Sequence, residues 1–107
     1  MVDPTIADSV KRYLLRLREE GLAVSFGVIF GSFATGTPHQ WSDIDLMVVS
    51  PRFDGPVARD DINRLWRTAA RTDNRIEPVA CGERQWVEDT SRAIVEIARR
   101  GGTRIAP

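Results

Sequence analysis

Two aspartates in one short apolar segment are the side chains of this sequence best suited to chemistry. Asp43 and Asp45 begin a segment whose alternation of residue types predicts a β-strand over 43–49. Residues two apart in a strand point to the same face, so the two carboxylates would lie about 6.6 Å apart along the strand. Two like charges on a poorly solvated strand need protons, a cationic partner or a metal ion.

A metal ion would give this pair of carboxylates a definite chemistry. Hard oxygen ligands favour Mg²⁺ or Mn²⁺. Two such ions about 3.5–4 Å apart activate an attacking oxygen and stabilise a leaving phosphate oxygen. The structural alternative is that Asp43 is a turn residue at the strand end and that Asp45 pairs with a nearby arginine.

A second candidate, Gly31-Ser32, follows directly on an apolar segment that predicts a strand over 22–30. A glycine at a strand end lets the backbone approach a ligand closely, and a serine that opens a helical turn offers a hydroxyl beside N–H groups that suit phosphate oxygens. The same glycine could instead serve a tight hairpin turn. No Gly-x-Gly-x-x-Gly and no Gly-Lys-Ser/Thr occurs here, which excludes the familiar kinase-like and dinucleotide-binding loops.

The elements that must position these residues follow from apolar periodicity. The order helix, strand, turn, strand, helix, strand, helix predicts an α/β (α+β) fold. We expect a small mixed sheet of about three strands, covered on one face by helices. Pro78 lacks a backbone donor and therefore places the third strand at a sheet edge or at a bulge. The expected helices span 3–20, 57–72 and 83–100, and the expected strands span 22–30, 43–49 and 75–81.

The aromatic residues divide into core and site candidates. Helical spacing predicts that Trp66 faces inward, and it predicts the same for Trp86 and Ile97 of the last expected helix. Core packing is therefore the expected role of Trp66 and Trp86. Trp41 lies in the loop before the two aspartates and could stack on a base. His39, in the same loop, is expected at the surface, with a nucleotide contact as the alternative.

Composition limits the classes of protein. The 107 residues, with fifteen basic and fifteen acidic side chains and 42% apolar content, indicate one globular domain over 1–107. No apolar run is long enough for a membrane helix and no signal segment opens the chain, so a cytoplasmic location without membrane contact is expected. The single cysteine, Cys81, excludes a disulfide framework and is expected to be packed. Zero net charge argues against general nucleic-acid binding.

Taken together, Gly31-Ser32, ten further residues and Asp43-Ile44-Asp45 resemble the signature of the nucleotidyltransferase superfamily that includes polymerase beta. The chain is similar over nearly its whole length to the smallest members, the minimal nucleotidyltransferases, and the specific part of the likeness lies in residues 30–49 and 75–78. This resemblance implies a nucleotidyltransferase fold and a third carboxylate on a later strand.

The candidate for the third carboxylate is Glu77, in the stretch Arg75-Ile76-Glu77-Pro78. A glutamate can ligate a metal or act as the general base that takes the proton of an attacking hydroxyl. The alternatives are that Glu77 is a solvent-facing residue of an edge strand, or that Asp73 in the preceding turn fills the role.

The resemblance also implies a mechanism. Asp43 and Asp45 hold two Mg²⁺ ions, Gly31 and Ser32 hold the terminal phosphates of a nucleoside triphosphate, and Glu77 completes the metal site or deprotonates the acceptor. An acceptor hydroxyl attacks the α-phosphorus, a nucleoside monophosphate (AMP, with ATP as the expected donor) is transferred, and pyrophosphate leaves. Catalysis would consist mainly of positioning and charge neutralisation.

The resemblance further implies a partner. Minimal members of the family are commonly paired with a HEPN-domain toxin, whose ribonuclease activity they neutralise, in some cases by adenylylating it. A HEPN-domain toxin is therefore the expected partner and acceptor, and the protein is expected to act as the antitoxin. A chain with little room for an acceptor-binding domain also favours a protein as the acceptor.

One departure from the family pattern affects this expectation. Relatives often carry Arg or Lys four residues after the motif glycine, where this chain has Thr35. Phosphate charge would then be met by Ser32, backbone and metal, or by Arg75 or Arg52. The same departure motivates the rival hypothesis, a weak or inactive nucleotidyltransferase fold that neutralises its toxin by binding. A dinuclear metal phosphohydrolase is a third alternative, and it predicts phosphate release without pyrophosphate.

Overall fold

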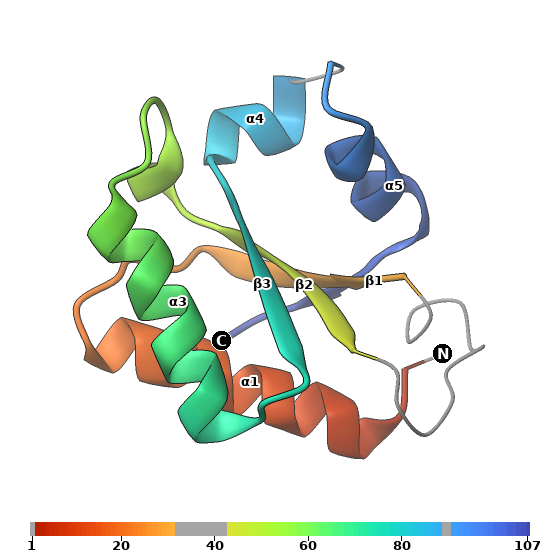
Figure 1. The fold of residues 1–107 in the computed structure, drawn as a ribbon. Coiled ribbons are helices and arrows are strands. Elements are labelled where there is room, and N and C mark those ends of the chain that lie inside the picture. Colours follow the sequence, from red (N-terminus) through yellow and green to blue (C-terminus); the bar gives the residue numbers. More distant parts are fainter. Residues whose placement is uncertain (1, 32–42, 89–90) are drawn as a thin grey trace.

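The chain forms a mixed sheet between two layers of helices in the computed structural model, which describes residues 2–31, 43–88 and 91–107 (Figure 1). Within these ranges, no helix combines the length and the apolar character that crossing a membrane requires. In chain order the elements are α1 (Pro4–Glu19), β1 (Phe26–Phe30), β2 (Ile44–Val49), the 3₁₀ turn η1 (Pro51–Phe53), α3 (Arg59–Thr72), β3 (Ile76–Cys81), α4 (Glu83–Glu88), α5 (Ala93–Gly101) and β4 (Thr103–Ile105).

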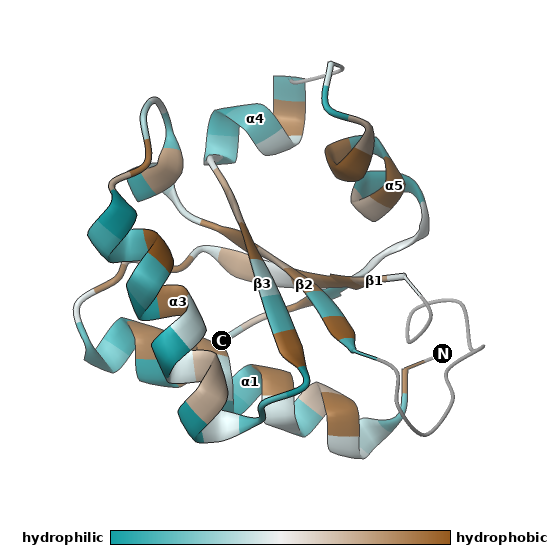
Figure 2. Cartoon of the chain, viewed as in Figure 1, coloured by the Kyte–Doolittle hydropathy of each residue, from teal (hydrophilic) through white to brown (hydrophobic). Residues whose placement is uncertain are grey.

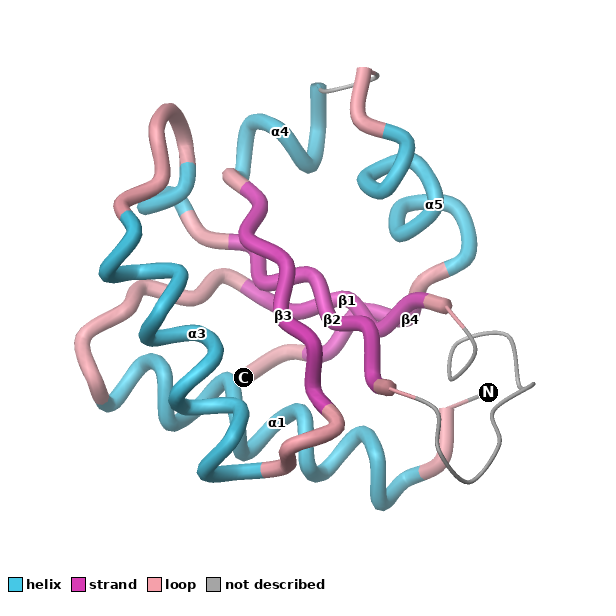
Figure 3. The backbone as a smooth tube through the Cα atoms, viewed as in Figure 1, coloured by secondary structure: helices cyan, strands magenta, loops and turns pink. Residues whose placement is uncertain are grey.

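The described strands lie in the order β3-β2-β1-β4 (Figure 3). β1 runs antiparallel to both β2 and β4, whereas β2 and β3 are parallel and are joined through η1 and α3. The end of β1 and the starts of β2 and β3 therefore meet at one end of the sheet. The mixed sheet is confirmed, as is the edge position that Pro78 predicted for β3.

One face of the sheet packs on α1 and α3. Asp3 caps α1 by accepting a hydrogen bond of 2.8 Å from the backbone N–H of Thr5, and the apolar stripe of α1 is buried as its spacing predicts. Tyr13 joins the two helices because its hydroxyl donates to the carbonyl of Leu65 at 2.9 Å. The core on this face includes Leu14, Leu17, Ile29, Ile44, Leu46, Val48, Phe53, Leu65 and Ile76.

The expectation that helices cover one face only is wrong. Met47 and Val49 of β2 point away from α1 and α3 and form a second buried cluster with Val28, Val95 and Ala98, beneath α4 and α5 (Figure 1). The physical reason lies in β2 itself, which is apolar at consecutive positions (Figure 2), as strands buried on both faces are. A single helix layer would have left half of those side chains in water.

The prediction of one continuous helix over 83–100 is also wrong. Arg92 has the extended backbone angles φ −93° and ψ 114°, so α4 and α5 are separate helices. The restart changes which residues of the second helix face the sheet: Val95 and Ala98 are buried, and Ile97 is 58% exposed. Trp66, expected inward, is 47% exposed because α3 packs beside β3, which is an edge strand.

The sheet also has a strand that periodicity did not predict. β4 contains only three residues and pairs with β1, placing Ile105 opposite Gly27 and Thr103 opposite Ile29. Three residues are too few to show an alternation. The tight junction between α5 and β4 places Gly102 against β1, where an added Cβ would meet the carbonyl oxygen of Ile29 at 3.1 Å.

Candidate functional site

Strand pairing brings the predicted carboxylates together at one end of the sheet. In the register of the sheet, Asp45 lies opposite Phe30, the last residue of β1, and opposite Glu77, near the start of β3. Asp43 precedes β2 by one residue and is exposed, whereas Asp45 and Glu77 are half-buried. Because Asp45 and Glu77 are direct neighbours on parallel strands, their side chains share one face of the sheet.

Gly31 is fitted to this cluster by its backbone and by its lack of a side chain. Its φ is +75°, in the left-handed region that favours glycine. A Cβ at this position would collide with the Oδ2 atom of Asp45. The glycine that the sequence singled out therefore lies directly against a carboxylate of the site, and its partner in the motif, Ser32, lies outside the described residues.

The three carboxyl groups perturb one another electrostatically. Burial, and secondly the charge of Asp43, raises the pKa of Asp45. The pKa of Glu77 is also raised, first by burial and then by the charge of Asp43, by a hydrogen bond with Asp43 and by the charge of Asp45. This hydrogen bond raises the pKa of Glu77 because it favours the protonated form of that carboxyl group. Among the described residues, no cationic side chain offsets the repulsion that raises these two pKa values. Positive charge is therefore favoured at this place.

The donor chemistry of the cluster fits a divalent cation such as Mg²⁺. Carboxylate oxygens are the ligands that this ion prefers, and a cation would remove the repulsion that raises the pKa of Asp45 and of Glu77. In the part of the chain that the structure describes, no group of three or more His, Cys, Asp or Glu side chains is gathered closely enough to hold a metal ion. Glu77 and Asp43 share a hydrogen bond, and a bound cation would favour closer approach of all three side chains because it would offset their repulsion.

The two arginines considered for phosphate lie at opposite ends of β2. Arg52 follows the far end of the strand and pairs with the buried Asp61 at 2.8 Å, away from the carboxylates. Arg75 lies beside them, and its guanidinium is paired with Asp73 at 2.7 Å. Asp73, the alternative third carboxylate, therefore forms an ion pair with Arg75. Glu77 is the carboxylate that lies in register with Asp45.

The remaining sequence candidates divide into packed residues and residues outside the described ranges. Trp86 is half-buried and packs edge-on against Phe26, with ring centroids 5.7 Å apart, so it is a packing residue as expected. Cys81 is fully buried, also as expected. Thr35, His39 and Trp41 lie outside the described residues.

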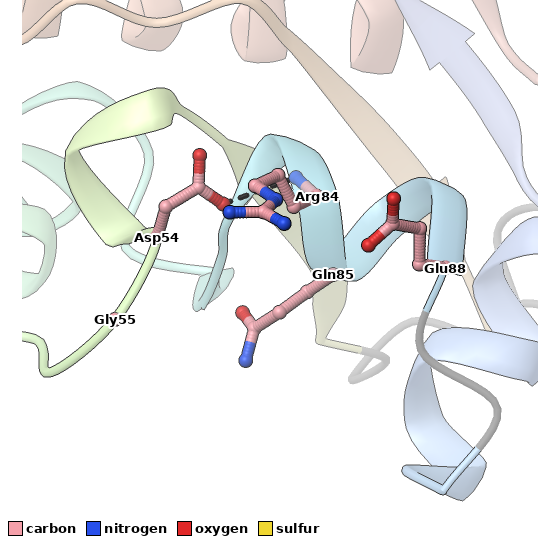
Figure 4. A pocket seen from close by; sticks show the side chains of 5 residues that line it. All are labelled: Asp54, Gly55, Arg84, Gln85 and Glu88. Carbon is pink, nitrogen blue, oxygen red and sulfur yellow. Dashed lines mark hydrogen bonds between the residues drawn. The ribbon is translucent and has the colours of Figure 1, made fainter.

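An open groove of about 540 Å³ (Figure 4) follows the ends of β2 and β3, at the opposite end of the sheet from the carboxylates. It is lined by Asp54, Gly55 and residues of α4, among them Arg84, whose backbone N–H donates to Asp54 at 3.0 Å. No motif or periodicity in the sequence indicated this groove, because its residues come from a loop and a short helix. Its position separates it from the carboxylate cluster.

The protein is thus a small α/β domain that carries a carboxylate cluster at one end of its mixed sheet. A glycine with a positive φ lies beside the cluster. The model of the nucleotidyltransferase domain family matches residues 10–97, which is most of the chain, and the chain therefore belongs to that family.

Solved structures are similar to the chain in fold. One is a crystal structure of a toxin-antitoxin with AMP-PNP, at a TM-score of 0.63 and 19% identity, covering 92% of this chain and 70% of that one. Another is "a putative nucleotidyltransferase from Sulfolobus solfataricus", at a TM-score of 0.61 and 15% identity, covering 92% of this chain and 77% of that one. No curated protein matches the chain.

Proposed function

We propose that this nucleotidyltransferase-family protein transfers a nucleoside monophosphate from a nucleoside triphosphate, with ATP as the expected donor, to a hydroxyl group. The observation that carries the proposal is the carboxylate cluster of Asp43, Asp45 and Glu77 beside Gly31. Two of its members have a raised pKa because of burial and like charge. The family membership supports the reaction class.

We propose a role for each residue of the site. Asp43 and Asp45 would hold two Mg²⁺ ions, with Mn²⁺ as a substitute, and Glu77 would complete the metal site or act as the base. The bound metal supplies neutralisation of the triphosphate charge. Gly31 leaves room for the Asp45 carboxylate, and we propose that Gly31 and Ser32 contact the terminal phosphates of the nucleotide.

The transfer step itself makes few demands on the protein. The acceptor oxygen forms a bond to the α-phosphorus, the bond from that phosphorus to the bridging oxygen breaks, and pyrophosphate leaves with the electron pair. The acceptor proton passes to a general base, and the Glu77 carboxylate is the residue that we propose for this role if it does not ligate the metal. Positioning and charge neutralisation provide the rest of the rate.

We propose a HEPN-domain toxin as the acceptor, which makes this protein the antitoxin of the pair. The likeness of the fold to a toxin-antitoxin structure containing AMP-PNP supports this proposal. The rival hypothesis, an antitoxin that acts by contact alone, shares the fold and the partner but needs neither metal nor carboxylates.

One experiment separates the two hypotheses. The protein is incubated with ATP labelled at the α-phosphate, Mg²⁺ and the product of the adjacent gene, and the label on that product is measured. We expect label transfer that Asp45→Asn abolishes and that Asp8→Asn, the same change on the exposed face of α1, leaves intact. Absence of transfer, with toxin inhibition unchanged by Asp45→Asn, would overturn the enzymatic proposal in favour of binding alone.

A further inference from the structure

The turn before β3 holds an arginine in a fixed orientation beside the carboxylate cluster. The Nε atom of Arg75 donates to Oδ1 of Asp73 at 3.0 Å, and Nη2 donates to Oδ2 at 2.7 Å. The backbone N–H of Arg75 donates to the same Oδ1 at 3.1 Å. Two parallel bonds between a guanidinium and a carboxylate define the plane of the guanidinium as well as its position.

Asp73 is itself anchored, which separates this ion pair from ordinary surface pairs. Its side chain is only 11% exposed. The hydrogen bonds from Arg75 are the largest cause that lowers the pKa of Asp73, and a further hydrogen bond comes from Ser9 of α1. Exposed ion pairs are usually loose because two long side chains must be ordered to form them. Here the short aspartate is ordered by the fold, so only the arginine loses that entropy.

The position of Arg75 is tied to the cluster through the backbone. Its carbonyl accepts a hydrogen bond of 2.7 Å from the N–H of Ile44, the residue between Asp43 and Asp45. Along the chain Arg75 precedes Glu77 by two residues. A residue bonded to one acidic strand end and adjoining the other lies at the edge of the proposed nucleotide site.

The pairing also keeps the arginine and the cluster apart. Both side-chain hydrogen bonds of the Arg75 guanidinium go to Asp73, which therefore meets its charge. An arginine whose backbone is bonded to Ile44, between two of the carboxylates, could otherwise pair with them and compete with a metal ion.

We propose that Arg75 binds phosphate oxygens of the nucleotide, and that Asp73 holds its guanidinium in place for this contact and away from the metal-binding carboxylates. The inference rests on the proposed function and deepens it. The Nη1 edge of the guanidinium takes no part in the two bonds to Asp73. The planar fork of arginine suits phosphate. Arg75 thus supplies the cation that Thr35 does not.

The first test compares nucleotide binding with metal binding in Arg75→Ala. Mn²⁺ affinity is measured by electron paramagnetic resonance, and affinity for Mn²⁺-ATP is measured with a fluorescent ATP analogue. We expect Mn²⁺-ATP to bind about tenfold to a hundredfold more weakly, the effect of losing a charge-assisted hydrogen bond. Mn²⁺ alone is expected to bind no more weakly, because a positive charge near its ligands has been removed. Disruption of β3 would weaken both.

Matched variants complete this test. Arg67→Ala removes the same charge from the exposed surface of α3 and is expected to leave both affinities unchanged. Arg75→Lys keeps the charge without the fork and is expected to bind Mn²⁺-ATP with an affinity between those of the wild type and Arg75→Ala. Arg75→Ala with Mn²⁺-ATP affinity within twofold of the wild type would overturn the proposal.

The role of Asp73 is tested by releasing the arginine. In Asp73→Asn we expect Mn²⁺ to bind about fivefold more weakly, the effect of one positive charge placed about 4 Å from a carboxylate in water. Adding Arg75→Ala to Asp73→Asn is expected to restore Mn²⁺ affinity. A double variant that binds Mn²⁺ as weakly as Asp73→Asn would show that Asp73 acts only on the structure of the turn.

Failure of the proposed function gives a different result. If the wild type binds neither Mn²⁺ nor Mn²⁺ complexes of ATP, GTP, CTP or UTP, the proposed function is wrong and the role of Arg75 is wrong with it. If the wild type binds both metal and nucleotide but Arg75→Ala behaves as the wild type does, only the role of Arg75 is wrong.

Discussion

Replacing Gly31 with alanine tests whether the Asp45 carboxylate depends on the space that the glycine leaves. Two other glycines provide matched controls, because Gly21 and Gly55 also have positive φ angles, +97° and +88°, and an added Cβ at either meets nothing within 4 Å. At Gly31, with φ +75°, the added Cβ would collide with Oδ2 of Asp45. The three substitutions share the backbone strain, and only one adds the collision.

The expected loss of stability is the same for all three variants. An L-residue in the left-handed region costs about 1–2 kcal/mol. The atom that the new Cβ would strike in Gly31→Ala is the end of a short side chain, which can rotate aside. We therefore expect the free energy of unfolding of Gly31→Ala to match the controls within about 0.5 kcal/mol. Urea unfolding measures this quantity, and thermal unfolding should show a fall of about 4–8 °C for each kcal/mol.

The expected effect on metal binding differs among the three. In Gly31→Ala the Asp45 carboxylate is displaced from the cluster, so Mn²⁺ affinity is lost, whereas the variants at Gly21 and Gly55 keep the affinity of the wild type. Two results would refute the reasoning. One is wild-type Mn²⁺ affinity in Gly31→Ala, and the other is an equal loss of affinity in the controls, which would make metal binding a consequence of stability alone.

Three further predictions concern stability. Without metal, Glu77→Gln should raise the free energy of unfolding at pH 7 and leave it unchanged at pH 3, as measured by urea unfolding at each pH. Because the pKa of Glu77 is raised in the folded state, the wild type has its full stability below the unfolded pKa of 4.5, where Glu77 is protonated, and loses stability as the pH rises through the folded pKa. Glutamine stays uncharged and avoids this loss. Tyr13→Phe should cost about 1 kcal/mol, because the buried carbonyl of Leu65 loses its donor, with unchanged Mn²⁺ affinity as the control measurement. Gly102→Ala should lower the free energy of unfolding by about 1–3 kcal/mol, measured by chemical unfolding, because the added Cβ would strike backbone of α5 and a side chain of β1. The control is Gly101→Ala, whose Cβ meets nothing within 4 Å and which should leave the free energy of unfolding unchanged.

The placement of the candidate carboxylates at one end of the sheet could be predicted in part, because Asp43, Asp45 and Gly31 lie at strand ends that local patterns identify. Asp43 and Asp45 open a strand whose alternation is plain, and Gly31 follows another. The neighbour relation between Asp45 and Glu77 is different in kind, because it depends on the parallel register of β2 and β3, which no local spacing determines. Only the likeness to a family suggested that Glu77 would reach the pair.

Other parts of the structure depend on tertiary context that local patterns do not contain. Trp66 belongs to an apolar stripe of α3, yet it is half-exposed because that helix packs on an edge strand with no further strand beyond it. Arg92 gives no sequence signal for the extended backbone that separates α4 from α5. The pairing of Arg75 with Asp73 joins residues two apart in a turn, where arginine and aspartate are too common to predict a contact.

The parallel pairing of β2 with β3 has a consequence for how the protein acquires its activity during folding. We expect the antiparallel ribbon of β1 and β2 to assemble first, because β3 and its Glu77 reach β2 only through the crossover of η1 and α3, and such non-local pairings form slowly. A chain that has completed only the ribbon carries Asp43 and Asp45 without the third carboxylate. Such a chain is expected to be catalytically silent, so competence for nucleotidyl transfer would arise late, with the docking of the final parallel strand.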